Sequence, residues 1–65
     1  MWVEFMSVPN AYVADTWREL FAAEGLAVRI IPPIGVGETA PKTEPRVIHV
    51  PTGKAHVARE ILRKI

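Results

Sequence analysis

Residues 10–26 carry the signals for the start, the buried stripe and the end of one amphipathic helix. Asn10 can accept a hydrogen bond from the free amides of a first helical turn, and Gly25 can adopt the left-handed conformation that ends a helix. Between these two residues, apolar side chains recur at intervals of three and four: Val13, Ala14, Trp17, Leu20 and Phe21. The segment therefore predicts a helix with one buried face, on which Leu26 folds back against Phe21.

Three short apolar segments flank or follow this helix, and each is typical of a strand. Residues 2–6 and 27–31 are rich in β-branched and aromatic side chains, and residues 46–50 end at a proline. Thr52 is then the expected cap of a second helix, whose buried side holds Ala55, Ala58, Ile61, Leu62 and Ile65. Residues 32–45 contain four prolines and two glycines, which predicts a loop.

The order strand, helix, strand, strand, helix predicts a single α+β domain over residues 1–65. Two strands joined by a helix run parallel, and a third strand reached through a loop fits antiparallel between them. The result is a ferredoxin-like split βαβ unit without its fourth strand, with sheet order 1-3-2 and both helices on one face. The core is expected to consist of Val3, Phe5, Ala14, Trp17, Phe21, Val28, Ile30, Ile48, Val50, Ala58, Ile61 and Leu62.

The same residues resemble a known family. The helix pattern that ends in Gly25 and Leu26, and the later strand over residues 46–50 before Pro51 and the apolar pair Ile61 and Leu62, are similar to a small bacterial domain described as a putative signal-transducing protein. This resemblance covers nearly the whole chain. It implies a βαββα unit loosely similar to the PII regulatory proteins, whose effector loop joins strands 2 and 3, and it transfers no catalytic residue to this sequence.

Size and composition narrow the classes of function. A chain of 65 residues without cysteine has a small core, no disulfide and no thiol chemistry. Its formal net charge is only +1, although residues 1–26 hold four acidic side chains against one basic and residues 46–65 hold five basic against one acidic. We expect a cytoplasmic protein, because the first residues lack a basic leader and no segment reaches the length of a membrane helix.

Two segments are candidate binding sites. Ile34, Gly35, Val36 and Gly37 contain a Gly-x-Gly and form the candidate partner-binding loop, although prolines rather than a helix follow the glycines. Thr52, Gly53 and Lys54 lie between a strand and a helix, which is a better position for an anion but without the remaining P-loop residues. Capping of the helix is the competing interpretation of this tripeptide.

The remaining titratable residues indicate no catalytic or metal site. His56 and Glu60 are four residues apart on the last helix, and a third ligand would have to be His49 from a strand. The basic face formed by Lys54, Arg59, Arg63 and Lys64 lacks interleaved aromatic residues, so nucleic acid is not an expected partner. We expect no cofactor and no metal.

The first strand is the predicted oligomer edge. If Val3 and Phe5 face the core, then Trp2, Glu4 and Met6 point outward beside unpaired backbone groups. Glu4 is the only charged residue there that would deter pairing with another strand. The sequence thus predicts a homodimer or a protein partner. The expected function is a non-enzymatic interaction or regulatory module, with a small-ligand or anion sensor at the start of the second helix as the alternative.

Overall fold

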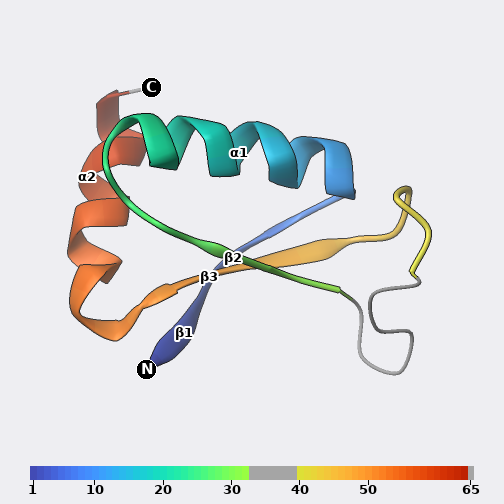
Figure 1. Cartoon of the computed structure of the whole chain (residues 1–65), viewed down its shortest axis with the longest axis horizontal. Coiled ribbons are helices and arrows are strands. Elements are labelled where there is room, and N and C mark those ends of the chain that lie inside the picture. Colours follow the sequence, from blue (N-terminus) through green and yellow to red (C-terminus); the bar gives the residue numbers. More distant parts are fainter. Residues whose placement is uncertain (33–39, 65) are drawn as a thin grey trace.

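The computed structural model of the chain describes residues 1–32 and 40–64, which form one layer of strands covered by helices (Figure 1). Within these residues the strands are three and the α-helices two. Their order along the chain is β1 (Trp2–Val8), α1 (Ala11–Ala23), β2 (Arg29–Ile31), β3 (Arg46–Pro51), a 3₁₀ turn η2 (Thr52–Lys54) and α2 (Ala55–Lys64). The predicted α+β class and element order are confirmed.

The sheet has the predicted strand order β1-β3-β2. β3 is antiparallel to both neighbours, with Val3 opposite Val50 and Ile30 opposite Ile48, so β1 and β2 run parallel to each other. In Figure 1, α1 lies along one side of the strands and α2 lies across one end of them. Both helices pack on the same sheet face, because side chains from each of them share a core with β3.

The ends of α1 form as the sequence predicts. The Asn10 side chain accepts a hydrogen bond from the Val13 amide at 2.9 Å. Gly25 has φ +84°, and the Leu26 amide donates to the Phe21 carbonyl at 2.9 Å, which is the pattern of a Schellman cap. Leu26 is buried beside Phe21, so the backbone turn also closes an apolar contact.

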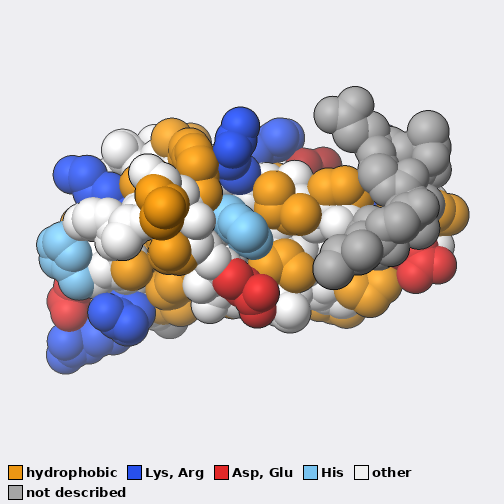
Figure 2. All heavy atoms as spheres, turned by 90° about the horizontal axis from the view of Figure 1, so that it is seen from below, with side chains coloured by type: hydrophobic (Ala, Val, Ile, Leu, Met, Phe, Trp, Pro, Cys, Tyr) orange, Lys and Arg blue, Asp and Glu red, His pale blue; other side chains and the backbone are white. Residues whose placement is uncertain are grey.

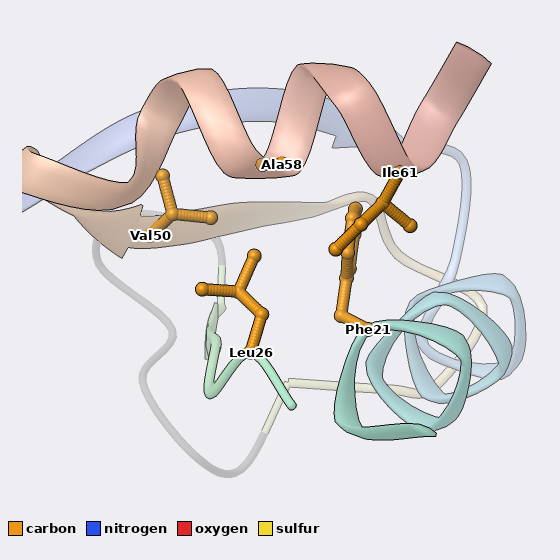
Figure 3. Packing of buried hydrophobic residues seen from close by; sticks show 5 residues of the cluster. All are labelled: Phe21, Leu26, Val50, Ala58 and Ile61. Atoms are coloured by element: carbon orange, nitrogen blue, oxygen red, sulfur yellow. The ribbon is translucent and has the colours of Figure 1, made fainter. Parts of the chain in front are cut away.

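The core consists of two adjoining clusters under the helices. Figure 3 shows the first, in which Ala58 and Ile61 of α2 face Phe21, Leu26 and Val50. The second contains Val8, Ala14 and Ile48. All twelve predicted core residues belong to these clusters or pack against them, whereas Leu20 of the predicted stripe is 38% exposed. Ile65, which was expected on the buried side of the second helix, lies outside the described residues.

An irregularity in β1 changes which of its residues face the core. The pairing with β3 shifts between Glu4 and Met6, which leaves Phe5 as the extra residue of a β-bulge. After this shift, Met6 pairs with the buried Ile48 and packs against the second cluster. The prediction that Met6 points outward is therefore wrong, because the bulge breaks the strict alternation of strand side chains on which it depended.

A buried arginine holds the segment before β3. Arg46 is 7% exposed, and its guanidinium donates hydrogen bonds to four backbone carbonyls, those of Ala40, Pro41, Glu44 and Pro45, at 2.8–3.2 Å. Lys42 of the same segment offers its carbonyl to the Ala11 amide at 2.9 Å. Residues 40–45 are thus fastened both to the start of β3 and to the first turn of α1.

Candidate interaction face

The sheet face opposite the helices carries the candidate site. Directly paired residues of antiparallel strands point to the same side of the sheet. The residues that pair with the buried positions of β3 therefore lie on the helix side, and the alternate pairs lie on the opposite side. We call this second surface the open face; its residues are Trp2, Glu4, Ser7, Arg29, Ile31, Val47, His49 and Pro51. Neither α1 nor α2 packs on it.

Three strands contribute one polar row across the middle of the open face. His49 on the central strand pairs with Glu4 of β1 on one side and with Arg29 of β2 on the other. Glu4 and Arg29 are exposed, and His49 is half-buried between them. Figure 2 shows a histidine in the middle of this surface, between acidic and basic side chains, with hydrophobic side chains on both sides of the row.

Trp2 and Arg29 are in contact above β3, although they belong to different edge strands. The guanidinium carbon of Arg29 lies 5.1 Å from the centre of a Trp2 ring, within the range of a cation–π interaction. The contact spans the central strand, since Trp2 pairs with Pro51 of β3 and Arg29 pairs with His49. It covers part of the indole and fixes both long side chains on the open face.

The apolar part of the open face is half-buried rather than fully exposed. Val47 and Ile31 are paired neighbours at one end, and Pro51 lies beside Trp2 at the other. The site therefore has an acidic edge, a basic edge and apolar ends. Among residues 1–32 and 40–64 no pocket is present.

At the candidate anion site, both donors of Thr52 are engaged in another contact. Thr52 donates from both its amide and its hydroxyl to the Met1 carbonyl, at 2.8 and 3.0 Å. Pro51 occupies the cap position of η2, and no side chain caps that turn. The prediction that Thr52 caps the last helix is wrong, because its hydroxyl ties the amino terminus to the end of β3. Gly53 and Lys54 are exposed beside it.

The polar residues of α2 lie on its solvent side. Arg63 pairs with Glu60 at 3.1 Å, and Lys64 pairs with Glu24 at 3.2 Å, which links the two helix ends. His56 is exposed on the same helix, seven residues after His49. In the described part of the chain, no three histidine or acidic side chains lie together as a metal site would require.

The predicted oligomer edge and the predicted partner-binding loop have different outcomes. Trp2 and Glu4 lie on the outward side of β1 as expected, whereas Met6 does not. The candidate loop Ile34, Gly35, Val36 and Gly37 lies outside the described residues. No helix in the described ranges has the length and apolar character to cross a membrane.

The contact of Arg29 with Trp2 and the pairing of Arg29 with His49 were not evident from the sequence. Each residue was visible as an outward position of its own strand, but their proximity follows only from the central place of β3 and its exact register. The signal that could have located the site was the predicted 1-3-2 order, which places His49 between the two edge strands.

Comparison with known proteins adds no relative: no protein-family model matches the chain, and no curated protein or solved structure is significantly similar to it. The resemblance to the signal-transducing family accordingly stays a prediction.

Proposed function

We propose that this protein is a non-enzymatic interaction module that binds a protein partner through the open face. The observation that carries the proposal is the row Glu4, His49 and Arg29 on a three-stranded sheet surface that neither helix covers. A surface of this kind, with a charged row flanked by apolar positions, is suited to a partner surface of the same mixed character.

The open face is left without a helix because both helices pack on the other side of the sheet. α1 and α2 both bury their apolar sides against one face of the sheet, which satisfies the core clusters. Among the described residues, the other face then retains half-buried Trp2, Ile31 and Val47, on which neither helix packs. Arg29 shields Trp2 only in part, through the cation–π contact.

Site-specific photo-crosslinking tests the proposal. A benzoylphenylalanine placed at Val47 lies on the open face, and the same residue placed at Tyr12, which is 62% exposed on α1, is the control. In living cells, the Val47 probe should yield a discrete protein adduct that the Tyr12 probe does not. Equal adduct patterns from the two positions, or none from Val47, would exclude the open face as the binding surface.

A further inference from the structure

We propose that the partner of the open face is a second copy of this chain, packed face to face about a twofold axis parallel to β3. This inference rests on the proposed function and names its partner. It follows from how the charges are distributed on the face. The acidic residue Glu4 lies on β1 and the basic residue Arg29 lies on β2, at the same level on either side of His49.

A twofold axis along β3 exchanges the two edges of the sheet between copies. The β1 edge of one copy then lies over the β2 edge of the other, which places Glu4 opposite Arg29 twice in the dimer. The His49 residues of the two copies meet near the axis, and Val47 and Pro51 each meet their own counterpart. The same surface serves both copies, as a closed twofold interface requires.

The other in-plane twofold axis, perpendicular to β3, gives the opposite result. It would place Glu4 over Glu4 and Arg29 over Arg29, so both edges would carry like charges in contact. Like charges across an interface disfavour an arrangement, so the charges select the axis parallel to β3. Aligned packing of two twisted sheets at about 10 Å separation accommodates this geometry.

Face packing is favoured over pairing along the β1 edge, which the sequence predicts. The bulge at Phe5 interrupts the regular spacing of β1 backbone groups, and bulges are a known protection against edge pairing. The open face carries no such interruption on β3, where the residues alternate regularly between buried and half-buried. A small core also gains from covering Trp2, Ile31 and Val47.

Charge reversal tests the arrangement by sedimentation equilibrium. The wild-type chain should dimerise, and Glu4→Arg or Arg29→Glu alone should raise the dissociation constant about tenfold or more, since each reversal replaces two attractive pairs by two repulsive ones. An equimolar mixture of the two variants should dimerise as the wild type does, because both Glu4–Arg29 positions again carry opposite charges. This rescue acts between chains and so does not depend on contacts within one chain.

Matched controls carry the same charge change away from the face. Glu19→Arg on α1 and Arg59→Glu on α2 alter exposed side chains and should leave the dissociation constant unchanged. Circular dichroism establishes that each variant is folded. A wild-type chain that is monomeric at high-micromolar concentration, single reversals without effect, or a mixture that is not rescued would each overturn the dimer.

The crosslinking probe at Val47 separates failure of the dimer from failure of the proposed function. An adduct of twice the chain mass supports the second copy. An adduct of another mass overturns the second copy but leaves the open face as a protein-binding surface. The absence of any adduct from Val47 overturns both.

Discussion

The Arg46 guanidinium donates a hydrogen bond to the Ala40 carbonyl at 3.1 Å, and both residues are more than nine-tenths buried. The same guanidinium nitrogen also reaches the Pro41 carbonyl, and the other reaches Glu44 and Pro45. A buried cation is thus stabilised by backbone dipoles, and among the described residues it makes no ion pair with a carboxylate. Its role is to hold residues 40–45 in place at the start of the central strand.

Replacement of Arg46 by Ala should lower the free energy of unfolding by about 2–4 kcal/mol, because one buried and three part-buried carbonyls lose their donors. Urea unfolding measures the loss, and hydrogen exchange should show faster exchange of the amides of residues 42–44. Arg59→Ala on the exposed side of α2 is the control and should change stability by no more than about 0.5 kcal/mol. Equal effects at the two positions would contradict the anchoring role.

Phe21 is the apolar residue on which the helix phase depends. Its ring lies 6.1 Å from Phe5 in an edge-to-face contact and 5.9 Å from Trp17. Phe21→Ala should cost about 3–5 kcal/mol, which is close to the whole stability of a domain this small. Leu20→Ala at the next position, where the side chain is partly exposed, should cost much less. Similar thermal midpoints for the two variants would mean that α1 is rotated relative to the structure.

The helices and the topology could be predicted because their signals are local. Asn10, Gly25 and the spacing of Ala14 and Phe21 act within one helix, and they form the cap, the turn and the buried stripe without help from distant residues. The order of elements then left few arrangements of the strands. The predicted sheet order 1-3-2 is therefore observed.

The misplaced residues depend on contacts between distant parts of the chain. Met6 faces the core because a bulge at Phe5 lets the first strand match both ends of β3, and no local pattern marks the bulge. Thr52 donates to Met1, a residue 51 positions away, instead of capping the helix beside it. Arg46 is buried although arginine is rarely so, since four carbonyls of a proline-rich segment converge on it.

The candidate face was only half predictable for the same reason. Strand alternation identified Trp2 and Glu4 as outward, but it could not show that the side chains of Trp2 and Arg29 meet above β3. That contact depends on the register of two separate pairings, which the sequence specifies only through the packed core.

Gly25 and Gly53 provide a paired test of backbone conformation. Gly25→Ala should destabilise the protein by about 1–2 kcal/mol, because φ +84° is unfavourable for a residue with a Cβ although no atom lies within 4 Å of it. Gly53 has an equally open surrounding without a positive φ, so Gly53→Ala should be neutral or stabilising by up to about 1 kcal/mol. Differential scanning calorimetry should separate the two variants, and equal midpoints would be inconsistent with the left-handed cap.

The bulge in β1 can be tested by placing the same charge at adjacent positions. Met6→Asp introduces a carboxylate against Val8, Ala14 and Ile48, so it should lower stability by about 2–4 kcal/mol. Ser7→Asp puts the same group on the exposed side of the strand and should change stability by less than about 0.5 kcal/mol. Without the bulge, strict alternation from Val3 and Phe5 would direct Met6 to solvent and position 7 toward the core, and the two effects would be reversed. Urea unfolding at low-micromolar protein, where self-association contributes least, distinguishes the two registers: a stable Met6→Asp variant beside an unstable Ser7→Asp variant would exclude the bulge.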